Sequence, residues 1–395
     1  MELNMTKGKM VLFVTALFLT NIVVMHDFVV IPVVANLYEM FEAQTNLVNY
    51  IISGPQLVGV VTALLCGKLM QYFSKKSLIV WGFAAFAVAA IFGVAIENVY
   101  FIAGMRTIVG GAMGIVNVAA LALLAEVFVD ENKRSMLMGW FNSAMAGVGA
   151  VMSLAAGFLA TISWKAVFNT YWIAVPVLVL LIFFLPKTPP EKEMVEDGGG
   201  KKEPMPLKTF IPFCLSLLTF VTVFMVLQFM ISLYVAEAQI GNEAYIGLVG
   251  SLSTLGSAVA CFLFGFTYNK LRRGSIIPSY LILAVGYLLL YFTKNPAVTA
   301  VTYACMGAAF GNGFSYFCMQ ATVIAPPSQV STAIGFVTAI QGFGMFFSTY
   351  FATILFTLLN VSTLTAIMPV LAGIAGIGAV LSVILTVKNR EHKMI

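Results

Sequence analysis

Charged residues and histidines are scarce in this sequence, and their scarcity excludes several classes of protein. Asp, Glu, Lys and Arg make up 9% of the 395 residues, against about 25% in an average soluble domain. The two histidines, His26 and His392, form no HExxH pattern of the kind that holds a catalytic zinc ion. We therefore expect no enzyme, no metal site and no cofactor.

Other signatures are missing as well. Alternating ten-residue strands do not occur, which argues against a membrane barrel. The stretch GGGKK at 198–202 is no phosphate-binding loop, because Val195 stands where the first glycine belongs and Lys202 where Ser or Thr should be. This excludes an ATP-driven pump. A disulfide framework and a zinc site are not indicated either, because the five cysteines lie inside apolar segments without CxxC spacing: Cys66, Cys214, Cys261, Cys305 and Cys318.

Hydrophobic residues are what the sequence has in excess. They make up 61% of the chain, and the mean hydropathy is +0.98. A helix that crosses a bilayer needs about 20 mostly apolar residues. Twelve segments meet this requirement and predict an all-α membrane protein of the cell membrane: 11–36, 47–69, 78–96, 100–125, 135–160, 166–186, 209–236, 244–268, 275–293, 297–323, 331–358 and 363–387.

The basic residues predict the orientation of these helices. With a cytoplasmic amino terminus, 18 of the 21 Lys and Arg residues fall in loops on the cytoplasmic side. This is the bias known as the positive-inside rule, and it places both termini in the cytoplasm. The net charge of +5 is thereby explained by topology, and no basic domain is left to bind nucleic acid. MELNMTKGK leads straight into a segment too long for a signal peptide, so we expect the first helix to stay in the membrane.

A polar connection and an internal repeat divide the chain into two halves. Residues 187–208 are rich in Pro, Gly and mixed charge, as flexible linkers are. They separate a predicted bundle of six helices at 1–186 from a second at 209–395. GKLMQYFSKKSLI from Gly67 and GFTYNKLRRGSII from Gly265 lie 198 positions apart, and GGAMG at 110–114 precedes GAAFG at 307–311 by 197. We therefore expect two pseudo-symmetric bundles.

These features resemble the major facilitator superfamily, whose loop between helices 2 and 3 carries the pattern G-x-x-x-D-[RK]-x-G-[RK]-[RK]. Gly67, Lys75 and Lys76 fit it, whereas Gln71, Tyr72 and Ser74 depart from it. Arg106 four residues before Gly110 is similar to the family's R-x-x-x-G pattern in helix 4, and an acid followed by Pro32 is similar to its first helix. The resemblance covers the whole chain and implies a monomeric secondary transporter that works by alternating access. Gln71 and Asn269, neutral where the family has loop acids, imply a weakened cytoplasmic latch.

The stretch NIVVMHDFVVIPVV at 21–34 places Asp27 in an apolar run. A charge near the middle of a membrane costs about 2.5–3.5 kcal/mol and is expected to face a cavity or a partner. By helical rise, Asp27 and Arg106 lie roughly 5 and 10 Å to the outer side of their segment midpoints, so their depths are compatible. We expect Asp27 to be a proton site facing a cavity and Arg106 to hold its anionic form. A fixed buried salt bridge is the alternative.

Other polar residues in the apolar segments are candidate substrate contacts. On a regular helix His26 stands about 100° from Asp27, so we expect the two not to share a partner. His26 is then a relay, a substrate contact or a histidine bonded to a neighbouring helix. Polar side chains also serve as interhelical hydrogen bonds, and that reading stays open for the remaining candidates: Gln56, Asn117, Asn142, Gln228, Tyr303 and Gln341.

A third group of residues is predicted to act in gating near the cytoplasmic ends of the helices. Glu126 and Arg134 flank the turn between helices 4 and 5 and are expected to form a structural or gating pair. The other predicted gating residues belong to the duplicated loops. The full set is Gly67, Lys75, Lys76, Glu126, Arg134, Gly265 and Arg273.

The fifth predicted helix bears on the direction of transport. Proton-driven exporters of the superfamily often carry G-x-x-x-G-P-x-x-G-G there. Gly149 and Gly157 match this pattern, but Ser153 and Leu154 replace its central Gly-Pro.

One Asp, one Arg and several amides among many Met and Phe suit a small organic or amphiphilic compound better than a polyanion. We expect proton-coupled, multidrug-efflux-like transport, with proton-coupled uptake of an organic solute or anion, or an uncoupled facilitator, as alternatives.

Overall fold

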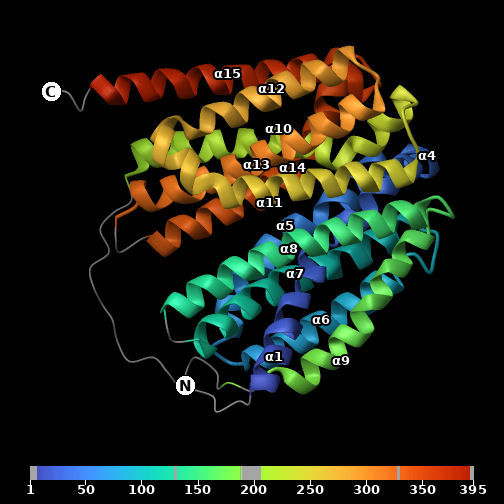
Figure 1. The fold of residues 1–395 in the computed structure, drawn as a ribbon. Helices are drawn as coiled ribbons and strands as arrows, with labels where there is room; N and C mark the ends of the chain where they lie inside the picture. Colours follow the sequence, from blue (N-terminus) through green and yellow to red (C-terminus); the bar gives the residue numbers. More distant parts are fainter. Residues whose placement is uncertain (1–6, 129–130, 187, 189–205, 327–329, 392–395) are drawn as a thin grey trace. The chain divides into compact units, whose positions relative to one another are not determined.

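The computed structural model describes residues 7–128, 131–186, 188, 206–326 and 330–391 (Figure 1). These residues are almost entirely helical, and no strand occurs among them. The chain separates into two compact units, Met1–Gly198 and Gly199–Ile395. The boundary lies in the predicted linker at 187–208, most of which is outside the described residues.

The first unit contains the six segments predicted before the linker. Its first span is not one helix but a chain of short pieces: α1 (Lys7–Leu19), α2 (Asn21–Val24), α3 (Asp27–Val30), η1 (Ile31–Val33) and α4 (Val34–Met40). The short turn η2 (Glu42–Gln44) leads into α5. The remaining spans are α5 (Thr45–Leu69), α6 (Lys75–Ile91), α7 (Val99–Val127), α8 (Glu131–Ala160) and the pair η3 (Ala166–Ile173) with α9 (Ala174–Phe184).

The second unit repeats this series with fewer interruptions. Its spans are α10 (Leu207–Ala238), α11 (Glu243–Leu271), η5 (Arg272–Ile276) with α12 (Ile277–Phe292), α13 (Pro296–Ile324), α14 (Val330–Leu359) and α15 (Leu364–Glu391). The carboxylate of Glu237 at the end of α10 accepts hydrogen bonds from the backbone N–H groups of Leu364 and Thr365, at 2.6 and 3.0 Å. It thereby satisfies donors at the start of α15 that no helical carbonyl can reach.

The helices have the length and composition of membrane spans. In the described part of the chain, nine helices are long and apolar enough to cross a bilayer, and the bent pair Gly8–Val24 and Asp27–Met40 forms a tenth. Helix α6 has 17 residues, and α13 carries several glycines and polar side chains; they account for the other two predicted spans. The expected fold, an all-α protein with twelve membrane helices, is therefore confirmed. The cytoplasmic placement of the termini stays a prediction.

The two units repeat details of packing as well as helix order. Asn98 and Asn295, 197 positions apart, cap α7 and α13 by accepting from the N–H groups two and three residues ahead. Gly110 of α7 lies so close to α5 that a Cβ there would be 2.6 Å from Pro55 Cα, and a Cβ at Gly307 of α13 would be 2.6 Å from the carbonyl carbon of Ser253. The glycine repeat seen in the sequence therefore marks one close helix crossing in each unit.

We expect Gly110→Ala to lower the melting temperature in detergent, because the added methyl group meets backbone rather than a side chain that could move. Overpacking of this kind costs about 1–3 kcal/mol. Gly104→Ala on the same helix is the matched control, since a Cβ there has no heavy atom within 4 Å. Equal melting temperatures for the two variants would show that the α5–α7 crossing has room to spare.

Candidate functional site

Asp27 lies at a break in the first span. Helix α2 ends at Val24, α3 begins at Asp27, and the two parts of the span meet at an angle of 50°. Pro32 lies in the following turn η1; it has no N–H to donate to the carbonyl of residue 28, and its ring clashes with that carbonyl in a regular helix. A proline about one turn ahead is a common cause of such a kink. The predicted single helix over 11–36 is therefore wrong in this stretch.

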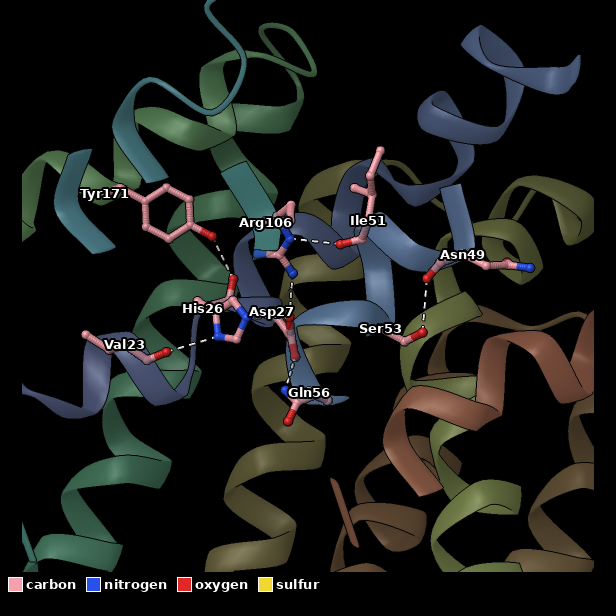
Figure 2. A network of polar contacts seen from close by, with 9 residues as sticks. All are labelled: Val23, His26, Asp27, Asn49, Ile51, Ser53, Gln56, Arg106 and Tyr171. Atoms are coloured by element: carbon pink, nitrogen blue, oxygen red, sulfur yellow. Dashed lines mark hydrogen bonds and ion pairs between the residues drawn. The ribbon is translucent and has the colours of Figure 1, made fainter. Parts of the chain in front are cut away.

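Arg106 and Asp27 form a buried ion pair, shown in Figure 2. Arg106 Nη2 donates to Asp27 Oδ1 at 2.6 Å. The two residues are only 3% and 6% exposed. Removing either partner of such a pair strongly destabilises a protein, because the other is left as an uncompensated buried charge. The contact that the sequence analysis expected from depth and spacing is present.

A proline in α5 supplies Arg106 with a second partner. Pro55 lacks an N–H, so the carbonyl of Ile51, four residues earlier, has no helical donor. Arg106 Nε donates to this carbonyl at 2.8 Å. Gly110, one turn further along α7, packs on the backbone of Pro55 and brings the two helices close enough for this reach. Pro55, which the sequence analysis did not single out, thus helps to fix the guanidinium.

The other oxygen of Asp27 is bonded too. Gln56 Nε2 donates to Asp27 Oδ2. Gln56 is buried and follows Pro55 in α5, so α5 contributes to both members of the ion pair. The sequence analysis did not expect Gln56 beside Asp27, and its predicted role as a substrate contact stays a prediction.

His26 contacts Asp27 itself, a contact that the sequence analysis did not consider. Its Nε2 lies 3.0 Å from Asp27 Oδ1, the oxygen that also accepts from Arg106. The helix is broken between residues 24 and 27, so the rotation of 100° per residue does not apply. His26 Nδ1 lies 3.0 Å from the carbonyl oxygen of Val23, and the side chain is completely buried.

Tyr171 joins this cluster from η3 (Figure 2). Its hydroxyl donates to the carbonyl of His26 at 2.7 Å, a carbonyl that the helix break leaves at the turn before α3. Sequence reasoning missed Tyr171. The only signal was a tyrosine in the aromatic stretch FNTYW at 168–172, and nothing there indicates which helix it meets.

The second unit holds an uncharged counterpart of this cluster. Tyr303 OH donates to Gln228 Oε1 at 2.9 Å, and Ser253 Oγ lies 3.4 Å from the same oxygen. Ser253 and Tyr303 stand 197 positions after Gln56 and Arg106, the offset of the glycine repeat, and Gln228 lies in α10 as Asp27 lies in the first span. The two predicted residues Gln228 and Tyr303 are therefore brought together, and the phenol of Tyr303 stands where the first unit has the guanidinium.

The remaining predicted substrate contacts lie elsewhere. Asn117 is half-buried in α7 about three turns after Arg106, and Gln341 is half-buried in α14. In the described part of each unit neither contributes to the hydrogen-bonded clusters above. The side chain of Asn142 in α8 is outside the described residues.

Two of the predicted gating residues, Lys75 and Glu126, form an ion pair. Lys75 Nζ lies 2.9 Å from Glu126 Oε2, and Lys75 is buried. Ser74, which replaces a glycine of the loop pattern, caps α6 by accepting from the N–H of Ser77 at 3.2 Å. Glu126 is thus paired with Lys75; its expected partner Arg134, like Arg273, has a side chain outside the described residues. Lys76 is half-buried and Gly67 and Gly265 are exposed, with open space at both glycines.

Comparison with known proteins agrees with this architecture. The model of the Major Facilitator Superfamily matches residues 16–241 and again 212–394. The solved structure of a D-xylose-proton symporter is similar with a TM-score of 0.75 at 15% identity, covering 95% of this chain and 97% of that one. A bacterial homolog of the lysosomal transporter Spinster, in an inward-facing conformation, gives 0.72 at 15% identity, covering 97% and 95%. At these identities the likeness shows the fold.

Sequence relatives match over shorter stretches. A triacylglyceride transporter of Mycolicibacterium smegmatis is 29% identical over 39% of this chain and 27% of its own length. The arabinose-proton symporter of Escherichia coli is 24% identical, over 38% and 32%. The multidrug efflux pump LfrA of M. smegmatis is also 24% identical, over 42% and 32%. The matched stretches span less than a third of the length of these relatives.

Proposed function

Since the chain belongs to the major facilitator superfamily, we propose that it is a proton-coupled secondary transporter of a small organic or amphiphilic compound. The observation that carries this proposal is the buried ion pair between Asp27 and Arg106 in the broken first span. A transporter of this kind changes access to its substrate by moving two helix bundles about a site near the middle of the membrane. Its driving force requires a group that binds a proton in one state and releases it in another.

The surroundings of Asp27 allow such a change of charge. When a proton binds at this site, the attraction between Asp27 and Arg106 weakens, yet Arg106 keeps the hydrogen bond from Nε to the Ile51 carbonyl. The guanidinium therefore does not lose its position together with its anion. A pair that only joined two helices would not need this additional acceptor, which Pro55 makes available.

The uncharged cluster of the second unit supports a substrate without several negative charges. Gln228, Ser253 and Tyr303 offer hydrogen bonds and no cation. The hydrogen bonds from Ser253 and Tyr303 to the Gln228 side chain both end on Oε1. The N–H groups of the side-chain amide are therefore the donors that Gln228 would offer to a ligand. These residues are the substrate contacts that we propose first for the second unit, and Gln56 is the one that we propose first for the first unit. A polyanion would call for more than the single guanidinium of Arg106.

Export of an amphiphile is the first candidate, and uptake of a solute by symport is the second. The second is favoured by α8, which runs without a break over Glu131–Ala160 and contains no proline, whereas exporters often bend this helix at a Gly-Pro. The relatives named above include an efflux pump and a sugar-proton symporter. Both candidates use a proton that binds at the buried site around Asp27.

A transport assay separates these candidates. Purified protein is placed in liposomes with the membrane potential clamped, and a gradient of one pH unit is imposed in either direction, with ethidium as amphiphile and L-arabinose as solute. We expect one probe to be concentrated up to about tenfold, because one proton moving down one pH unit supplies 1.36 kcal/mol. The direction of the gradient that drives accumulation distinguishes exchange from symport. Equilibration without accumulation, for a probe that the protein carries, would show an uncoupled facilitator and contradict the proposal.

A further inference from the structure

Each ring nitrogen of His26 lies close to an oxygen: Nδ1 makes a hydrogen bond, whereas Nε2 makes an ion-pair contact and no hydrogen bond. The carbonyl oxygen of Val23 lies 3.0 Å from Nδ1, and Oδ1 of Asp27 lies 3.0 Å from Nε2. A carbonyl oxygen and an ionised carboxylate only accept hydrogen bonds. The ring is completely buried, so water cannot take the place of a missing donor at either nitrogen.

A neutral imidazole cannot satisfy both acceptors. It carries one N–H and one lone pair. With the hydrogen on Nδ1, the unprotonated Nε2 lies 3.0 Å from the carboxylate oxygen. With the hydrogen on Nε2, the lone pair of Nδ1 meets the Val23 carbonyl oxygen at 3.0 Å. Either tautomer leaves two acceptors in close contact inside the protein, where an unmet polar group is costly. An imidazolium has an N–H at both nitrogens and removes this conflict.

The carboxylate, rather than the ring, is the acceptor in this contact. Asp27 Oδ1 already accepts from Arg106 Nη2 at 2.6 Å, and Oδ2 accepts from Gln56. Both oxygens of Asp27 thus accept a hydrogen bond, as expected of an ionised carboxylate, which can accept about four. A proton on either oxygen would displace one of these donors, whereas a proton on His26 Nε2 adds a further donor to Oδ1.

No other charge in the described part of the neighbouring helices opposes this assignment. Arg106 from α7 is the nearby cation, and Asp27 is the anion between it and His26. Tyr171 from η3 donates to the His26 backbone and carries no charge. Helix α8 contacts α2 where the side chain of Asn21 donates to the carbonyl of Phe141 at 3.1 Å. The charged residues of α8, Glu131, Lys133 and Arg134, come about two turns or more before Phe141 along the helix.

We propose that the coupling proton is held on His26 Nε2 against Asp27 Oδ1, so that the proton site is a histidine–aspartate pair. This rests on the proposed function for the claim that the proton is transported. Loading takes one proton from water and forms one N–H bond, and release breaks that bond and returns the proton to water. The charge of His26, Asp27 and Arg106 together is +1 when loaded and zero when empty. In the structure the two atoms are in ion-pair contact at 3.0 Å, the charge arrangement that the loaded form requires.

Nitrogen NMR of the imidazole tests the protonation directly and needs no substrate. The full chain has two histidines, His26 and His392, so protein labelled with ¹⁵N-histidine in lipid nanodiscs gives two sets of signals, and His392→Gln leaves that of His26 alone. At pH 7 we expect both nitrogens of His26 to be protonated, whereas a solvent-exposed histidine titrates near pH 6.5. In Asp27→Asn we expect one protonated and one bare nitrogen. A bare nitrogen on His26 in the otherwise unchanged protein at pH 7 would overturn the proposal.

The transport arm uses His26→Gln in the liposome assay, with whichever of ethidium or L-arabinose the unchanged protein accumulates. We expect accumulation driven by one pH unit to fall from about tenfold to about onefold, while exchange of probe across membranes without a gradient continues. If His26→Gln accumulates normally and Asp27→Asn does not, the acid alone carries the proton and this inference is wrong while the proposed function stands. If both variants accumulate normally, the proposed function itself fails.

Discussion

Arg106→Met should be among the most destabilising single substitutions in the first unit. The change removes the guanidinium that faces Asp27 Oδ1 at 2.6 Å and keeps a side chain of similar length. It leaves a buried carboxylate without its main counter-charge, which costs about 3–5 kcal/mol. For a unit of this size each kcal/mol lowers the melting temperature by about 2–4 °C. We therefore expect a decrease on the order of 10 °C in detergent, measured by tryptophan fluorescence.

A double variant separates loss of the charge balance from loss of packing. Asp27→Asn combined with Arg106→Met removes both charges, so we expect it to recover most of the lost stability, because apolar or neutral replacements of a buried pair are often tolerated. Lys165→Met is the matched control: Lys165 pairs with Glu97 at the surface, where such pairs contribute about 0–1 kcal/mol. A double variant as unstable as Arg106→Met would mean that packing of the arginine, and not its charge, holds α7 to α5.

The ion pair itself could be predicted from the sequence. Asp27 and Arg106 lie in apolar segments at compatible depths, and pairing lowers the cost of burying their charges. Gly110, four residues after Arg106, indicated a close approach of another helix. The glycine repeat likewise predicted a crossing in each unit, and both crossings are present. These predictions succeeded because they depend on the cost of burying charge and on the lack of a side chain at glycine.

The positions of the groups around the pair could not be predicted. The expectation for His26 assumed a regular helix, and the break between Val24 and Asp27 turned its ring toward the carboxylate. Pro32 was noted in the sequence, but a proline does not by itself fix how many short helices replace one long helix. Tyr171 reaches the His26 carbonyl across 145 positions, and only tertiary packing determines such a contact.

One contact was within reach of sequence reasoning and was missed. A proline inside a helix always frees the carbonyl four residues earlier, so Pro55 implied that Ile51 would need a donor from another helix. Arg106, already expected near this depth, carries more N–H groups than Asp27 alone can accept. The combination of a helix proline with a buried arginine on the adjacent span is therefore a usable signal for how a guanidinium is anchored.

Asp27→Asn should abolish proton-driven accumulation without abolishing movement of the probe. The amide keeps the shape of the side chain and can still bond to Arg106 through its oxygen, but it cannot exchange a proton at neutral pH. With one pH unit imposed across proteoliposomes, we expect the accumulation ratio to fall from about tenfold to about onefold, while exchange at equal concentrations on both sides continues. Glu39→Gln is the matched control, because it makes the same chemical change at an exposed position of α4, twelve residues further along the same broken span. Accumulation by Asp27→Asn equal to that of Glu39→Gln would mean that the buried pair is a fixed structural contact and that the driving ion binds elsewhere.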